Sequence, residues 1–422
     1  MTIKNLKKAA NRISKAVKSR EKIIIYGDAD LDGVTAVIIL KEVIQNLGEP
    51  SGGKYPISAI YFPEREKEGY GINKTALDFL KPMAPALLIA LDCGIGNFQE
   101  VKIAKKLGFE VIIIDHHQVL DRLPEAQIIV DPKQKGDKYP FKEFATVGIV
   151  FKLSQLLLGK RVSEAMRKNF LELAALGTIA DMMTEENENK LFIAEGLESL
   201  ENSWRPGIRE FLNNISFNPG EKNRLNLRQK ISKIISILNV RDIENKMPAS
   251  FRVLTISSLK EAEKIIEKLL EKNEVKKEKI KKITQEVEED LSSSSPLAGA
   301  QEVEEDLSSS SPLAGAQEVE EGLSSSGKII FEGKSDWELP LLSSVASIIC
   351  NKYKKPTFLF KKGDRNSQGT VRIPKGLDDG VKAMMSCRQL LETYGGHSLA
   401  AGFSLKNENL KKFKECLNKY FK

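Results

Sequence analysis

The chain has little cysteine and no long apolar run, and each shortage excludes a class of protein. Its four cysteines (Cys93, Cys350, Cys387 and Cys416) lie far apart and form no Cys-x-x-Cys pair. A zinc site or a disulfide framework is therefore not expected, and a reducing cytoplasm is the expected location. No apolar run approaches the roughly 20 residues that cross a bilayer. The basic N-terminal segment also lacks the apolar core of a signal peptide, so no contact with a membrane is expected.

Charge is distributed unevenly along the sequence. The net charge is +7, but residues 285–326 contain eleven Asp or Glu and no Lys or Arg, so the rest of the chain carries +18. A body this basic suits a polyanionic partner such as nucleic acid. Lysines scattered for solubility would give the same total, and no dense basic patch separates the two interpretations.

The acidic stretch is also repetitive. A 16-residue segment, QEVEEDLSSSSPLAGA, occupies 285–300, recurs unchanged at 301–316, and is followed by a partial third copy. Its polar, low-complexity composition predicts a disordered insertion at 285–326. We interpret it as a tolerated loop expansion; a site for a protein partner is the alternative.

The first 200 residues alternate apolar runs with helical patterns, which predicts a doubly wound α/β domain around a parallel sheet. The runs are continuous rather than alternating, as in strands buried on both faces. The expected strands are 21–27, 57–62, 86–92 and 110–117, and the expected helices are 33–47, 73–80, 97–107 and 144–180.

The remaining residues predict a connector and a second, smaller α/β domain. Residues 201–284 read as a helical connector that ends in one long charged helix at 258–284. After the insertion, residues 327–422 contain three short apolar runs and three helical patterns, which predicts the second domain. The sequence YGGHSLAAGFSL (394–405) lies between its last two helices.

Acidic and imidazole side chains follow three of the four expected strands and one expected helix. They are Asp28, Asp30 and Asp32; Asp92; Asp115, His116 and His117; and Asp181. A helix cap explains one aspartate of the first group, not three. An EF-hand is excluded because position 12 from Asp28 is Ile39, where a glutamate is needed. Carboxylates with imidazole suit Mn²⁺, whereas all-oxygen sites suit Mg²⁺.

These motifs, taken together, resemble the DHH phosphoesterase superfamily. DADLDG, LDCG, DHH and GTIAD stand in that family's order, and GGHSLAAG (395–402) resembles the motif of the DHH-associated domain that follows. Within the superfamily, EGYGIN (68–73), TVGIVFKLSQLL (146–157) and WRPGIREFL (204–212) resemble RecJ-type single-strand exonucleases.

The resemblance implies a role for each matched residue. Two Mn²⁺ ions, or Mg²⁺, would be held by Asp28, Asp30, Asp32, Asp92, His116 and Asp181, with Asp92 bridging the pair. Asp115 would fix the tautomer of His116, and His117 would face the scissile phosphate, so Asp92, Asp115 and His117 are the expected catalytic residues. Nucleic-acid backbone would be bound by Arg372, Gly395, Gly396 and His397.

The resemblance therefore implies a metal-dependent phosphodiesterase that hydrolyses single-stranded nucleic acid by two-metal catalysis. A RecJ-like enzyme would act on DNA from 5′ to 3′, in repair or recombination. Two alternatives stay open at this point: a DHH phosphodiesterase for very short oligonucleotides or nucleotide phosphates, and a catalytically silent scaffold of the same fold in a replication complex.

Overall fold

The computed structural model describes residues 1–48, 57–119, 122–213, 225–240, 242–293, 328–377 and 379–421. The chain divides into two compact units, Met1–Asn273 and Glu274–Lys422, which are described separately below. Within the described ranges, no helix combines the length and the apolar character needed to cross a bilayer. Most of the predicted insertion, residues 294–326, lies outside the described residues.

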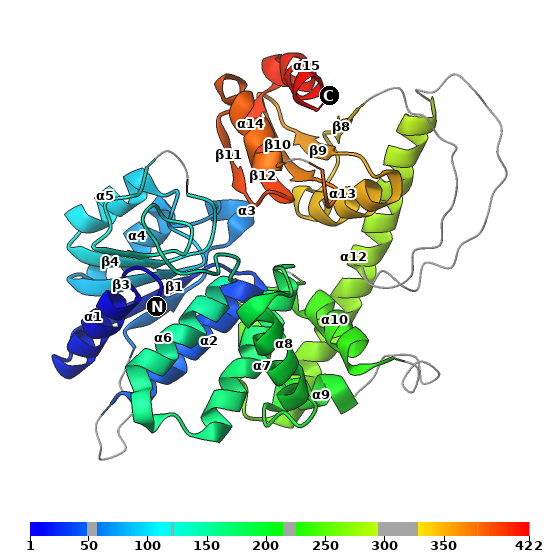
Figure 1. Cartoon of the computed structure of the whole chain (residues 1–422). Coiled ribbons are helices and arrows are strands. Elements are labelled where there is room, and N and C mark those ends of the chain that lie inside the picture. The colour runs from blue at the N-terminus through cyan, green and yellow to red at the C-terminus, as the bar shows by residue number, and fades with distance from the viewer. Residues whose placement is uncertain are drawn as a thin grey trace. The chain divides into compact units, whose positions relative to one another are not determined.

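The first unit is built on a five-stranded parallel sheet with the order β2-β1-β3-β4-β5, of which Figure 1 labels β1, β3 and β4. Its strands are β1 (Ile23–Gly27), β2 (Ala59–Tyr61), β3 (Ala86–Leu91), β4 (Phe109–Ile114) and β5 (Ile128–Val130). The four predicted strands and the doubly wound class are confirmed; β5 was not predicted. In such sheets ligands bind beyond the carboxyl ends of the strands, where the strand order reverses. Here the order reverses between β1 and β3.

Both faces of this sheet are buried, which explains the continuous apolar runs. Successive side chains alternate between faces, so Ile23 and Ile25 belong to one core and Ile24 and Tyr26 to the other. Helices cover the sheet on each face. The first five helices of the chain are α1 (Leu6–Lys18), α2 (Leu31–Asn46), α3 (Arg65–Glu68), α4 (Lys74–Leu80) and α5 (Phe98–Lys106). The core with Ile23 includes α1 and α2, and the core with Ile24 includes α4 and α5.

The rest of the first unit is mainly helical. Its elements are α6 (Thr146–Leu158), α7 (Glu164–Ala180), α8 (Asn187–Leu200), α9 (Pro206–Asn213), α10 (Leu227–Leu238), α11 (Ala249–Thr255) and the short pair β6 (Ile243–Glu244) and β7 (Met247–Pro248). The sequence predicted one helical stretch over 144–180, whereas the structure breaks it after Leu158. Gly159 has a positive φ of 52°, and Ser163 caps the next helix by accepting from the Met166 amide.

Helix α12 (Leu259–Ser293) is longer than the predicted 258–284. It includes the first nine residues of the repeated segment, which the sequence predicted to be disordered. The reason is an apolar stripe at i, i+4 spacing: Ile283, Val287 and Leu291 are buried in the second unit beside Trp337. The Trp337 indole N–H also donates to Glu286 over 2.8 Å. Tertiary packing therefore extends the helix into sequence that is polar on its other faces.

The second unit is a mixed five-stranded sheet with the order β11-β12-β10-β9-β8 (Figure 1). Its strands are β8 (Ile330–Lys334), β9 (Thr357–Lys362), β10 (Asn366–Arg372), β11 (Thr393–Gly396) and β12 (Ala400–Lys406), and its helices are α13 (Leu339–Tyr353), α14 (Gly380–Ser386) and α15 (Leu410–Tyr420). The prediction of a smaller second α/β unit is confirmed. The segment between its last two helices forms the hairpin β11–β12.

A disulfide joins Cys387 to Cys416 in the second unit, a pairing that was not expected from the sequence. The two residues are separated by 29 positions, but the packing of α14 against α15 brings their Cα atoms to 6.1 Å. Spacing along the sequence gave no sign of this pairing. Cys93 and Cys350 are free and buried. The cysteines were the reason to expect a reducing compartment, and the disulfide removes that reason.

Candidate metal centre

Three of the predicted site residues, Asp28, Asp92 and Asp115, lie directly after the carboxyl ends of β1, β3 and β4. Hydrogen bonding continues one residue past each strand: the Asp28 amide donates to Leu91, the Asp92 amide to Ile114 and the Asp115 amide to Val130, over 3.2, 3.0 and 3.0 Å. These bonds fix the backbone directly beneath the three carboxylates. The predicted convergence of the strand ends is therefore present in the structure.

The turn from β1 into α2 places three aspartates in five residues. Asp30 is the N-cap of α2 and accepts from the Gly33 amide over 3.1 Å. Gly33 is required because a Cβ there would lie 2.5 Å from the Asp28 carbonyl oxygen. Asp32 then points to the start of α6, where its two oxygens accept from the amides of Thr146 and Val147 over 2.7 and 2.8 Å.

One group of ligand atoms, which we call the inner seat, consists of Asp32, His116 and Asp181. Its ligand atoms lie within 4.8 Å of one another. His116 Nε2 is 3.8 Å from Asp32 Oδ2 and 3.4 Å from Asp181 Oδ2. Asp92 adjoins this group, with its Oδ1 3.3 Å from the same His116 nitrogen. Three carboxylates and one imidazole are a donor set for a borderline divalent cation.

A second group, the outer seat, consists of Asp28, Asp30 and Asp92, again with ligand atoms within 4.8 Å. Asp92 therefore belongs to one seat and adjoins the other, which is the position that a bridging carboxylate needs. The residue has a positive φ of 61°, which is uncommon for a residue other than glycine and turns the chain sharply after β3. The structure thus brings together all six residues predicted to bind metal.

The electrostatics of these carboxylates favour a bound cation. Asp32 and Asp92 are buried, and burial together with the charge of Asp30 raises the pKa of Asp32 to about 7 and that of Asp92 well above its usual range. Burial and the charge of Asp32 likewise raise the pKa of Asp181. Such groups resist ionisation because each charge is desolvated and repelled by its neighbours. A divalent cation would remove both effects, so the residues present fit the metal that their pattern implies.

Asp115 contacts His117, not the ring of His116 as predicted. Its Oδ1 lies 2.7 Å from His117 Nδ1, and the amides of Ile95, His116 and His117 also donate to its carboxylate. Burial opposes ionisation of Asp115, but His117 and these amides outweigh it, and the pKa of Asp115 is lowered. The predicted Asp115–His116 tautomer lock is therefore wrong; the carboxylate orients the neighbouring histidine.

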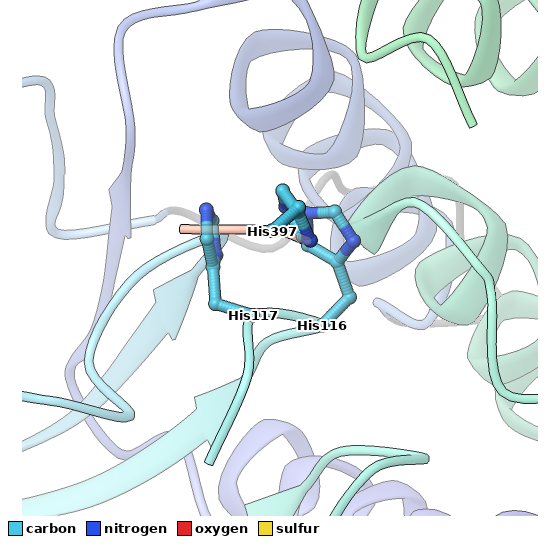
Figure 2. Close-up of side chains that lie close together, drawn as sticks. All are labelled: His116, His117 and His397. Carbon is cyan, nitrogen blue, oxygen red and sulfur yellow. The ribbon is translucent and has the colours of Figure 1, made fainter. Parts of the chain in front are cut away.

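The two histidines are adjacent in the chain but lie in different surroundings. Figure 2 shows their rings on the segment that follows β4, and the ring centroids are 4.7 Å apart at an interplanar angle of 63°. The His116 side chain is 1% exposed, whereas that of His117 is 22% exposed. His116 is thus placed as a buried ligand, and His117 is the one of the pair that solvent can reach.

Sequence reasoning assigned no role to two residues at this edge, Arg65 and Tyr70, although Tyr70 lies in the EGYGIN segment. Arg65 pairs with Asp28 and Asp30, and the Tyr70 hydroxyl donates to the Asp92 carbonyl oxygen over 3.0 Å and lies 3.3 Å from the His117 ring nitrogens. Both follow β2, so their place after a parallel strand was the available signal. The charge of Arg65 and the polarity of Tyr70 did not by themselves indicate a place in the site.

The four residues predicted to bind nucleic-acid backbone lie in the second unit at one end of β10 and the β11–β12 hairpin. Arg372 pairs with Ala400, and the His397 amide donates to the Ala400 carbonyl over 2.8 Å. The Arg372 guanidinium also contacts hydroxyls of α13, with Nε 3.0 Å from Ser347 Oγ. Gly396 has a φ of +133°, and a Cβ there would lie 2.6 Å from the Ala400 carbonyl oxygen.

Asp131 follows β5 at the same sheet edge. Its raised pKa can be tested by a measurement that needs no bound metal. It is fully buried; burial and the charge of Asp115 raise its pKa to about 8. Because the folded pKa exceeds the unfolded value of about 3.9, the folded state binds the proton more tightly. This contribution to stability is present below about pH 4 and is lost as the pH rises through about 8.

Asp131→Asn should therefore melt several degrees above the wild type at pH 8.5, and close to it at pH 4.5. The asparagine keeps the oxygen that accepts from the Lys133 amide. Thermal unfolding across this pH range, in a chelator, measures the effect. Parallel curves for the two proteins would contradict the assigned ionisation.

Comparison with known proteins identifies the family. The model of the DHH family, N-terminal domain, matches residues 22–178, and that of the DHHA1 domain matches residues 326–422. The chain thus carries a DHH domain followed by a DHHA1 domain.

Within the family the chain is similar to RecJ. It is 32% identical over 418 residues to the single-stranded-DNA-specific exonuclease RecJ of Bacillus subtilis, an alignment that covers 99% of this chain and 48% of that protein. It is 26% identical to the RecJ of Salmonella typhimurium over 95% of this chain and 66% of that protein. The chain thus spans about half to two thirds of the length of these relatives.

Solved structures support the same fold. An exonuclease RecJ bound to manganese superimposes with a TM-score of 0.70 at 24% identity, covering 100% of this chain and 95% of that one. RecJ of Thermus thermophilus in complex with Mn²⁺ gives a TM-score of 0.74 at 23% identity, covering 100% of this chain and 55% of that one.

Proposed function

We propose that this chain is a metal-dependent phosphodiesterase that degrades single-stranded DNA from its 5′ end, as a RecJ-like exonuclease with a role in DNA repair or recombination. The observation that carries the proposal is the gathering of Asp32, Asp92, His116 and Asp181 at one sheet edge, at distances suited to shared cations. The choice of single-stranded DNA as the substrate rests on the relatives, which are single-stranded-DNA-specific exonucleases. The 5′-to-3′ direction of cleavage rests on the resemblance to RecJ.

The inner and outer seats would hold two divalent cations, Mn²⁺ or Mg²⁺. Bound there, the cations would lower the pKa of water and offset charge on the phosphate. The solved RecJ structures with manganese and with magnesium support a divalent cation. Asp92, shared between the seats, would hold the pair together.

His117 would act on the substrate rather than on metal. Asp115 accepts a hydrogen bond from His117 Nδ1, which directs the remaining ring nitrogen away from Asp115. The negative charge of Asp115 raises the pKa of His117 against the effect of burial. A partly exposed imidazole with a raised pKa suits a group that binds phosphate oxygen and offsets the charge that develops on it.

In the second unit, Arg372 and the amides near Gly395, Gly396 and His397 would bind the phosphodiester backbone. A guanidinium binds phosphate in a fixed two-pronged geometry. Glycines allow the main chain to approach a phosphate closely, as the open space beside Gly395 illustrates. Such contacts carry no sequence preference, which fits an enzyme that degrades any single strand.

The test is digestion of single-stranded DNA and RNA, labelled separately at each end, with Mn²⁺ or Mg²⁺ and with a chelator. We expect mononucleotides from the 5′ end of single-stranded DNA, little cleavage of duplex, and no product in the chelator. Rates should fall steeply with salt, because phosphate contacts release counterions.

Other outcomes of this digestion would indicate one of the two alternative functions. Activity limited to substrates of two to five nucleotides would indicate a small-substrate phosphodiesterase. Complete absence of nucleotide release with every substrate and metal would favour the catalytically silent scaffold.

A further inference from the structure

Arg65, in the four-residue helix α3, lies between two carboxylates of the outer seat. Its Nε donates to Asp28 Oδ1 over 2.7 Å, and its Nη2 donates to Asp30 Oδ2 over 2.9 Å and also contacts the second oxygen of Asp28. The guanidinium carbon is 5.1 Å from the centre of the Tyr70 ring. The arginine is therefore held by charge-assisted contacts with two carboxylates and by one aromatic ring.

These contacts use the oxygens that a cation in the outer seat would need. Both oxygens of Asp28 face Arg65; of the Asp30 oxygens, one faces Arg65 and the other accepts from the Gly33 amide. A guanidinium at this distance also repels a second positive charge strongly, because Asp28 is fully buried and water screens little there.

The inner seat has a different environment. Asp32 is held by two backbone amides, which carry no net charge. Across the described ranges, no lysine or arginine forms an ion pair with Asp32, Asp92 or Asp181. The two seats therefore meet at Asp92 but differ in their ion pairs: within the described ranges, an arginine pairs directly with two carboxylates of the outer seat and with none of the inner seat.

We propose that Arg65 is an internal counter-ion that competes with a divalent cation for the outer seat, so that the inner seat loads first and tightly and the outer seat loads second and weakly. The proposal rests on the two-metal function above. Loading of the outer seat requires Arg65 to give up its contacts with Asp28 and Asp30. Its side chain is 28% exposed and extends from a helix of only four residues, so the movement needs no change in the core.

The test is a Mn²⁺ titration of the whole chain without substrate, followed by the electron paramagnetic resonance signal of free Mn²⁺ and by calorimetry. The wild type should show a tight and a weak class of site. Arg65→Gln should tighten the weak class about tenfold or more and leave the tight class unchanged. Arg65→Lys, which keeps the charge but loses the two-pronged contact, should fall between them.

Arg252→Gln is the matched control. Arg252 also pairs with two carboxylates, those of Asp242 and Glu244, and its side chain is 21% exposed, but it lies outside both seats. It should leave both classes unchanged. Circular dichroism and thermal unfolding of each variant establish that it is folded.

Two results would overturn the inference and can be told apart. If two classes exist but the weak class is unchanged or weakened in Arg65→Gln, Arg65 does not compete with the cation, and the proposed function stands. If neither the wild type nor Arg65→Gln binds Mn²⁺, the two-metal function fails and the inference falls with it.

Discussion

Asp92→Asn should lower metal-dependent hydrolysis of single-stranded DNA by on the order of 10⁴-fold, the scale seen when a residue of a cooperating catalytic unit is removed. Asp92 belongs to the outer seat, and its Oδ1 is 3.3 Å from His116 Nε2 beside the inner seat. An amide there would lose the charge that the two proposed cations would share, so neither seat would keep its full set of donors. The change also keeps the size of the side chain, so the surrounding structure should be preserved.

The fold of this variant can be checked separately from its activity. Because burial and neighbouring charges raise the pKa of Asp92, its ionised form is a cost to the metal-free fold. Asp92→Asn should therefore melt at or above the wild-type temperature in a chelator, and should gain less stability from added Mn²⁺. A matched control is Asp78→Asn, because Asp78 is exposed and pairs only with Lys74 in the described structure. An Asp92→Asn protein that keeps wild-type activity would remove Asp92 from the centre.

The sequence predicted that these acidic and imidazole residues converge, because parallel topology imposes the convergence. Once β1, β3 and β4 are recognised as parallel strands, their carboxyl ends meet at one sheet edge, and Asp28, Asp92 and His116 must lie near one another. This argument needs only the order of strands, which apolar runs reveal. It does not need side-chain conformations, and for that reason it predicted the set of residues but not every contact.

The errors concern contacts that depend on three-dimensional packing. The partner of Asp115 is decided by the ring orientations of two adjacent histidines, which spacing cannot specify. Arg65 contacts Asp30 although the two residues are 35 positions apart, and the sequence alone does not specify the packing that brings them together. The extension of α12 depends on the packing of Val287 in the core of the second unit. The disulfide at Cys387 depends on how the helices of that unit pack.

The second large expected effect concerns the adjacent histidines, because replacing His116 should impair metal binding whereas replacing His117 should impair catalysis. His116→Ala removes an imidazole whose Nε2 lies 3.3 Å from Asp92 and 3.4 Å from Asp181, so it should weaken the tight class of Mn²⁺ sites and reduce activity. His117→Ala leaves these donors in place. It should reduce kcat on the order of 10²–10³-fold with the tight Mn²⁺ affinity unchanged.

Mn²⁺ titrations and saturating single-turnover rates on both variants separate the two roles. Excess Mn²⁺ should recover part of the His116→Ala activity, because mass action refills a weakened seat. It should recover none of the His117→Ala activity if His117 acts on phosphate, as proposed above, and not on metal. Since Asp115 accepts from the His117 ring, His117→Ala also leaves Asp115 with its backbone donors only, those of Ile95, His116 and residue 117. Equal recovery of both variants by Mn²⁺ would assign His117 to the metal, and would place the group that binds phosphate elsewhere.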